Sequence, residues 1–184
     1  MREIEIKATI DSIQSIIDIL NQKGVSVTPP VTQRDRVYGQ IGVDGAAENT
    51  APWLRIRTET KNGATKDIFT LKRSITNQMD SIEHETVIED AIELENIVAQ
   101  LGFELYSDLT KTRQKAVIGD IEICLDAVDN LGTYIEAEKL TDGDVDYDAI
   151  IAELWTLLES LGVSKASAVT DGYDVLMNNK LIST

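Results

Sequence analysis

Residues 3–7 of this 184-residue chain are Glu3-Ile4-Glu5-Ile6-Lys7, in which charged and apolar side chains alternate. In a β-strand successive side chains point to opposite faces, so the charged residues share one face and the isoleucines share the other. One half-exposed strand of any sheet looks the same. The stretch is informative because later segments repeat it with charges of both signs on the second face, which predicts that charge collects on one side of a whole sheet.

Turn and cap signals divide the chain into strands and helices. The strands are predicted at 2–8, 31–39, 53–58, 67–74, 82–88, 108–118, 120–127 and 133–139, and the helices at 12–23, 90–101, 147–161 and 171–179. Residues 42–52 and the polar residues 76–80 are expected to be connections. Strands outnumber helices and follow one another in sequence, so a largely antiparallel sheet in a single domain over residues 1–184 is expected.

Composition limits the classes of function. A net charge of −15 argues against nucleic-acid or anionic-membrane partners, which need basic surface. The chain has no run of about 18 apolar residues, so no transmembrane helix is expected. It opens on a charged strand without the apolar core of a signal peptide. One cysteine, Cys124, excludes an internal disulfide and favours the reducing cytoplasm. Monomer and homodimer are both open.

Two interpretations of the alternating strands compete. The simpler is an antiparallel sheet with one solvated face. The other is an α+β fold in which eight strands close into a barrel with a polar interior and helices cover its apolar outside. The helical segments carry apolar stripes that need a partner surface, as in residues 147–161. This requirement favours the closed barrel.

The charged face contains both cations and anions, which inside a barrel must be paired or bound to a ligand. Arginine can grip phosphate oxygens with two hydrogen bonds, and lysine acts as a point charge, so the cations suit a polyanion. Carboxylates spaced i, i+2 lie about 7 Å apart on one face and could share Mg²⁺ or Mn²⁺. The lone His84 falls on the other face, which argues against a histidine-based site. The cations are Lys7, Arg55, Arg57, Lys72, Lys111 and Arg113, and the anions are Glu3, Glu5, Glu85, Asp126, Glu136 and Glu138.

The constellation resembles the CYTH superfamily, also called triphosphate tunnel metalloenzymes. The resemblance covers essentially the whole chain, and it rests on Glu-x-Glu-x-Lys at 3–7, Leu54-Arg55-Ile56-Arg57, Lys72, Glu85, Lys111-x-Arg113, Asp126 and Gly132-x-x-x-Glu136-x-Glu138 in the family's order. It implies an eight-stranded tunnel that binds triphosphate compounds with Mg²⁺ or Mn²⁺.

The resemblance also implies roles for individual residues. Lys7, Arg55, Arg57, Lys72, Lys111 and Arg113 would hold the phosphates. Glu5, Glu136 and Glu138 would bind the metal with support from Glu3 and Asp126, and Glu85 would pair with cations or with metal-bound water. Lys7 would also be the catalytic candidate, by activating a nucleophile or orienting a phosphate.

Three activities remain open under this resemblance. The short single-domain form and the segment from Asp126 to Glu138 look most like the class IV adenylyl cyclase branch, in which ATP gives cyclic AMP and pyrophosphate. A triphosphatase would instead release orthophosphate from thiamine triphosphate or inorganic triphosphate. Lys72-Arg73-Ser74 stands where cyclase-type members often have Lys-Gly-Pro. A non-catalytic triphosphate or nucleotide sensor is the third possibility.

Overall fold

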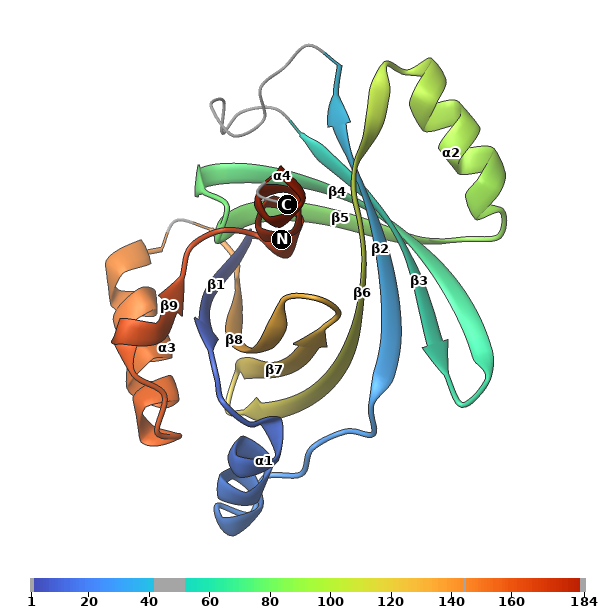
Figure 1. The fold of residues 1–184 in the computed structure, drawn as a ribbon. Coiled ribbons are helices and arrows are strands. Elements are labelled where there is room, and N and C mark those ends of the chain that lie inside the picture. Colours follow the sequence, from blue (N-terminus) through green and yellow to red (C-terminus); the bar gives the residue numbers. More distant parts are fainter. Residues whose placement is uncertain (1, 42–51, 144, 183–184) are drawn as a thin grey trace. The chain divides into compact units, whose positions relative to one another are not determined.

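A computed structural model describes residues 2–41, 52–143 and 145–182, and its elements follow the predicted order (Figure 1). The predicted connection at 42–52 lies, apart from its last residue, outside the described residues. The strands are β1 (Arg2–Thr9), β2 (Val31–Gln40), β3 (Trp53–Lys61), β4 (Ala64–Asn77), β5 (Asp80–Ile88), β6 (Phe103–Ile118), β7 (Ile121–Val128), β8 (Gly132–Thr141) and β9 (Ala168–Val169). The helices are α1 (Ile13–Gln22), α2 (Ala91–Gln100), α3 (Tyr147–Ser160) and α4 (Tyr173–Ile182), with a short 3-10 helix at Lys165–Ser167.

Hydrogen bonds join the strands in the order β5-β4-β3-β2-β6-β7-β8-β1-β9, and β5 also pairs with β1. The order of the eight long strands therefore closes on itself. This confirms the predicted α+β fold class, a closed and mainly antiparallel eight-stranded barrel with helices outside. The two-residue strand β9, which pairs with β1, was not predicted because two residues carry no alternation signal. The strands belong to two compact units, which are described in turn.

Unit 1 comprises Met1–Val31 and Lys111–Thr170. Its core lies between α1, α3 and the apolar faces of β1, β7 and β8. Ser12 caps α1 by accepting a hydrogen bond from the backbone N–H of Ser15. Because the isoleucines of these strands face the helices, the charged side chains that alternate with them project from the opposite face. The core includes Ile4, Ile6, Ile16, Leu20, Ile121, Ile123, Leu125, Ile135, Leu154 and Leu158.

Unit 2 comprises Thr32–Thr110 and Asp171–Thr184. Val98 of α2 is buried against the apolar face of β2 and β3, together with Tyr38, Leu54 and Ile56. Arg36 of β2 fastens the helix, since its guanidinium forms an ion pair with Glu95 and donates to Thr58 Oγ1 at 3.2 Å. The opposite face of these strands carries the charged side chains Asp35, Arg55 and Arg57 together with apolar ones such as Val37.

Several strand boundaries differ from the predictions, most of them by three residues or fewer, and two of the differences have a local explanation. β6 begins at Phe103, before the expected residue 108, because the polar residues that follow Phe103 continue a strand with one exposed face. The connection predicted at 76–80 shrinks to residues 78–79, where Asn77 Oδ1 accepts from the N–H of Met79 at 2.8 Å. Within the described part of the chain, none of the helices has the length and apolar composition needed to cross a membrane.

Candidate active site

The charged face of unit 1 is buried. Lys7 is 3% exposed, Arg113 7%, Asp126 0% and Glu136 4%. A merely solvated sheet face would leave such side chains in water, so the simpler interpretation of the alternation does not hold for this unit. Charges kept out of water need partners, and the strand register provides them.

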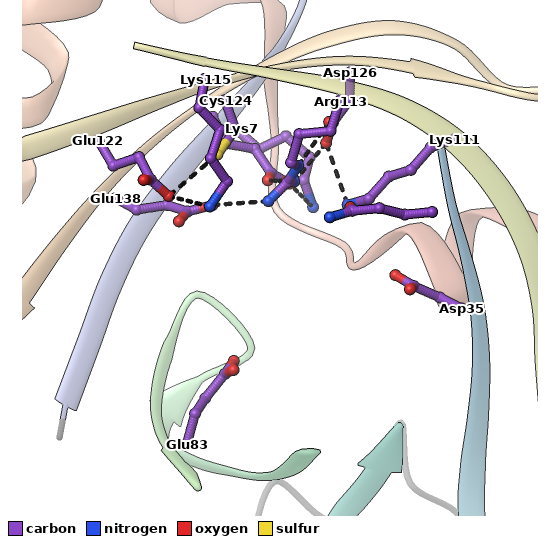
Figure 2. Close-up of polar contacts among 12 residues, drawn as sticks. Lys7, Asp35, Glu83, Lys111, Arg113, Lys115, Glu122, Cys124, Asp126 and Glu138 are labelled. Carbon is purple, nitrogen blue, oxygen red and sulfur yellow. Dashed lines mark hydrogen bonds and ion pairs between the residues drawn. The ribbon is translucent and has the colours of Figure 1, made fainter. Parts of the chain in front are cut away.

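Arg113 is the centre of these ion pairs (Figure 2). It lies directly opposite Asp126 in the β6–β7 pairing, and its Nε and Nη2 donate to the two carboxylate oxygens at 2.7 and 2.5 Å. The same Nη2 contacts Glu136, and Nη1 lies 3.4 Å from Glu138 Oε1. One planar guanidinium thus holds carboxylates from two strands in a fixed arrangement.

Two lysines complete this group, which we call the Arg113 cluster: Lys7, Lys111, Arg113, Asp126 and Glu136. Lys7 Nζ lies 3.3 Å from Glu136 Oε1, and Lys111 Nζ lies 3.3 Å from Asp126 Oδ2. Burial raises the pKa of Glu136, but Arg113 and Lys7 outweigh it and hold this pKa well below its usual range. The pKa of Asp126 is lowered in the same way, against its burial, by Arg113 and Lys111. Both carboxylates are therefore ionised at neutral pH.

A second feature, the carboxylate row, consists of Glu5, Glu138 and Glu122. Glu138 of β8 lies directly opposite Glu5 of β1 on one side and opposite Glu122 of β7 on the other. Like charges at directly opposite positions repel, so this register favours binding of a cation. The pKa of Glu138 is raised to about 7, and burial is the largest cause. The neighbouring charges of Glu136 and Glu5 also raise this pKa, whereas the charge of Arg113 lowers it.

Two residues of the row, Glu5 and Glu138, together with Glu136 of the Arg113 cluster, offer donor atoms that fit a hard divalent cation. Oxygens of Glu5, Glu136 and Glu138 lie within 4.8 Å of one another, as do donor atoms of Glu122, Cys124 and Glu138. The thiol of Cys124 is buried, and burial is the largest cause that raises its pKa well above the ordinary value. A protonated thiol is a poor ligand. The group with three carboxylates therefore fits best, and carboxylate oxygens suit Mg²⁺ or Mn²⁺.

Metal binding at this group should depend on pH. A metal ligand must be deprotonated, and Glu138 takes up a proton below about pH 7. Calorimetric titration with Mn²⁺ should show nearly constant affinity above pH 8 and a fall of about tenfold per pH unit below 7. Equal affinity at pH 6 and pH 8 would contradict the assignment of Glu138 as a ligand. Glu138→Gln should weaken the binding and remove this pH dependence.

Unit 2 carries its own charged group, the Arg57 cluster: Asp35, Arg55, Arg57, Thr70, Lys72, Glu83 and Glu85. Arg57 Nε and Nη2 donate to the oxygens of Asp35 at 2.6 and 2.7 Å. Lys72 Nζ lies 2.9 Å from Glu83 Oε1. Burial raises the pKa of Glu83, but Lys72 and Arg55 more than offset this and leave it below the ordinary value.

Arg55 belongs to a row that crosses three strands. It lies opposite Thr70, which lies opposite Glu85. Arg55 Nη2 donates to Thr70 Oγ1 at 3.2 Å and to Glu85 Oε1 at 3.1 Å, and the Thr70 hydroxyl donates to Glu85 at 2.8 Å. Glu85 thus pairs with Arg55, a cation of its own unit.

The predicted site residues divide between these groups. The Arg113 cluster and the carboxylate row bring together seven of them, which are Glu5, Lys7, Lys111, Arg113, Asp126, Glu136 and Glu138. Arg55, Arg57, Lys72 and Glu85 lie together in the Arg57 cluster. Glu3 lies two residues before Glu5 on β1, and it is in neither metal-capable group of the described residues. Sequence reasoning did not select Asp35, Glu83 or Glu122.

The family model of the CYTH domain matches residues 1–173 of this chain. The chain belongs to the CYTH family. It is 29% identical over 179 residues to a Methanocaldococcus jannaschii protein named "Putative adenylate cyclase MJ0240", a match that covers 94% of this chain and 97% of that one. The resemblance seen in the sequence is therefore confirmed at the level of the family.

Solved structures of other proteins share this fold. The PH1819 protein of Pyrococcus horikoshii has a TM-score of 0.82 at 24% identity, with 96% of this chain and 99% of that chain covered. HpAC1 from Hippeastrum, described as a "putative adenylyl cyclase" with a dominant triphosphatase activity, has a TM-score of 0.62 at 19% identity, with 93% of this chain and 90% of that chain covered. At these identities the likeness establishes the shared fold alone.

Proposed function

We propose that this CYTH protein is a divalent-metal-dependent enzyme that acts on a triphosphate, and that its reaction is the cyclisation of ATP. The observation that carries the proposal is the close arrangement on one face of unit 1: three carboxylates within 4.8 Å of one another lie beside the buried cations of the Arg113 cluster. A carboxylate group next to fixed cations is what a metal–polyphosphate complex requires.

In this proposal Glu5, Glu136 and Glu138 hold Mg²⁺ or Mn²⁺. When bound, the ion neutralises the charge that develops on the phosphate oxygens. Glu3 supports the group from the same strand as Glu5. Asp126 contacts Arg113 and Lys111, which favours a role in positioning these cations over direct metal binding.

The cations of the Arg113 cluster would hold the phosphate chain. Arg113 is kept in place by carboxylates on two strands, so little reorganisation is needed when phosphate binds. Lys7 is directed by its contact with Glu136, which favours orientation of a phosphate over abstraction of a proton. The family resemblance assigns Arg55, Arg57 and Lys72 of unit 2 to the phosphates as well.

For ATP, the ribose 3′-hydroxyl attacks the α-phosphorus and releases its proton to water, the bond from that phosphorus to the bridging oxygen breaks, and pyrophosphate leaves. The cations stabilise the charge that accumulates on the leaving pyrophosphate. The similarity to the M. jannaschii protein over nearly both full lengths supports this reaction as the first candidate.

A triphosphatase is the second candidate, in which water attacks the terminal phosphorus of inorganic triphosphate or thiamine triphosphate. Two observations favour it: the dominant triphosphatase activity ascribed to the structurally similar HpAC1, and Lys72-Arg73-Ser74 in place of the Lys-Gly-Pro typical of cyclase-type members. A sensor that binds triphosphate without turnover is the non-catalytic alternative.

One experiment separates the three activities. The purified protein is incubated in turn with ATP, inorganic triphosphate and thiamine triphosphate, with Mg²⁺ or Mn²⁺, and the products are resolved by chromatography. Cyclic AMP with pyrophosphate supports the cyclase. Orthophosphate from inorganic or thiamine triphosphate supports the triphosphatase. Tight binding of a triphosphate without formation of any product would leave the sensor as the remaining candidate.

A further inference from the structure

Asp35 and Arg57 form a two-point contact inside unit 2. They lie directly opposite each other in the pairing of β2 with β3. Arg57 Nε donates to Asp35 Oδ1 at 2.6 Å and Nη2 donates to Oδ2 at 2.7 Å. The side chain of Arg57 is 11% exposed and that of Asp35 is 6% exposed, so both hydrogen bonds are sheltered from water. Asp35 is not among the residues on which the family resemblance rests in this sequence.

A contact of this kind fixes more than one edge of the arginine. The guanidinium is planar, and its five N–H groups have fixed relative directions. Two parallel hydrogen bonds to Asp35 therefore set the plane and direction of the whole group, including the edge that faces away from Asp35. An arginine that is already oriented loses less conformational freedom when it binds an oxyanion.

We propose that Asp35 is a positioning residue that orients Arg57 to grip the triphosphate. This inference rests on the proposed function, in which Arg57 contacts the phosphates. The competing role is charge compensation, in which Asp35 only offsets the positive charge of Arg57. The two roles give opposite signs: loss of the carboxylate weakens triphosphate binding if Asp35 orients Arg57, and strengthens it if Asp35 merely compensates charge.

The chain contains a matched control for the same chemistry. Arg34, on the neighbouring position of β2, donates through Nε and Nη2 to the two oxygens of Asp108 at 2.9 and 2.6 Å. This pair has the same two-point geometry, but the side chain of Arg34 is 55% exposed and that of Asp108 is 35% exposed. Adjacent strand residues point to opposite faces, so Arg34 lies on the face away from the Arg57 cluster.

The experiment measures binding of inorganic triphosphate by calorimetry in metal-free buffer. Asp35→Asn keeps the shape of the side chain but replaces one of its two carboxylate oxygens with an NH₂ group. Only one acceptor then remains for the two N–H groups of Arg57. We expect the affinity of this variant to fall by at least about tenfold, and Asp108→Asn to stay within about twofold of the wild type. Arg57→Ala should also weaken binding, and adding Asp35→Asn to it should cause no further loss, because Asp35 acts through Arg57.

The outcomes separate this inference from the proposed function. Affinity for Asp35→Asn equal to or above that of the wild type, with Arg57→Ala impaired, overturns the positioning role and leaves the proposed function standing. Unchanged binding in Arg57→Ala overturns both the role of Arg57 and the inference built on it. If Asp35→Asn does not fold, Arg57→Lys decides: it keeps the charge without the planar fork, so binding as tight as in the wild type overturns the proposal, and a loss of about tenfold supports it.

Discussion

Replacing Arg113 with alanine is expected to lower the free energy of unfolding by about 3–5 kcal/mol, the usual cost of removing one partner from a buried ion pair. Arg113 is 7% exposed and contacts Asp126, Glu136 and Glu138. Without it, ionised carboxylates remain buried close together with only the lysines to balance them. A loss of this size is a large part of the total stability of an ordinary domain, about 5–15 kcal/mol.

Urea unfolding followed by circular dichroism measures this loss, and Arg34→Ala is the matched control. Arg34 has the same two-point contact with an aspartate but is exposed, so its removal should lower the free energy of unfolding by less than about 1 kcal/mol. Equal losses in the two variants would contradict the view that the Arg113 cluster is buried and mutually dependent.

The loss in Arg113→Ala should also depend on pH. Without the guanidinium, burial and mutual repulsion raise the pKa values of the remaining carboxylates, so they take up protons as the pH falls. Part of the buried negative charge of the variant is therefore neutralised by protons at pH 5, whereas all of it remains at pH 8. The difference from the wild type in the free energy of unfolding should therefore be larger at pH 8 than at pH 5.

Residue alternation was enough to predict the eight long strands and the face on which their charged residues lie, because the two-residue period of a strand is local. It was also enough, in principle, to predict the pair Arg113–Asp126. The turn at Gly119-Asp120 places Ile118 opposite Ile121, and counting back along both strands brings Arg113 opposite Asp126, as observed.

Other pairs depend on features that the sequence does not show locally. Counting from the pair Asn77–Asp80 would place Lys72 opposite Glu85, but a shift of register between Ser74 and Asn77 brings Glu83 there instead. Such an irregularity has no signal in a strand of alternating residues. The pairing of Glu83 with Lys72 therefore could not be predicted from the sequence.

Pairs across long connections were beyond sequence reasoning for a different reason. Asp35 meets Arg57 across a connection too long to set a register, since only tight turns fix the pairing of the strands they join. Glu5 and Glu138 lie on β1 and β8, which are far apart in the sequence, so no tight turn sets their pairing. Alternation predicted both glutamates as ligands but could not show that they face each other.

The second large effect is expected for Glu138→Gln, which should lower metal-dependent turnover of the triphosphate substrate on the order of a thousandfold while the fold persists. Glutamine has the size of glutamate but lacks the charge that a divalent cation needs. Glu122→Gln is the matched control, because Glu122 is the next carboxylate of the same row but is already paired with Lys115 and is 35% exposed. It should retain turnover within about tenfold.

Stability should move in the opposite direction to activity in Glu138→Gln. The pKa of Glu138 is raised to about 7 in the folded protein, above its unfolded value, so the ionised side chain disfavours the folded state at pH 8 and its neutral form does not at pH 5. Removal of the charge should therefore raise the melting temperature of the metal-free protein at pH 8 and change it little at pH 5. A variant that is more stable and nearly inactive would show that Glu138 is kept ionisable for metal binding, at the expense of stability. Turnover close to that of the wild type would refute its assignment as a metal ligand.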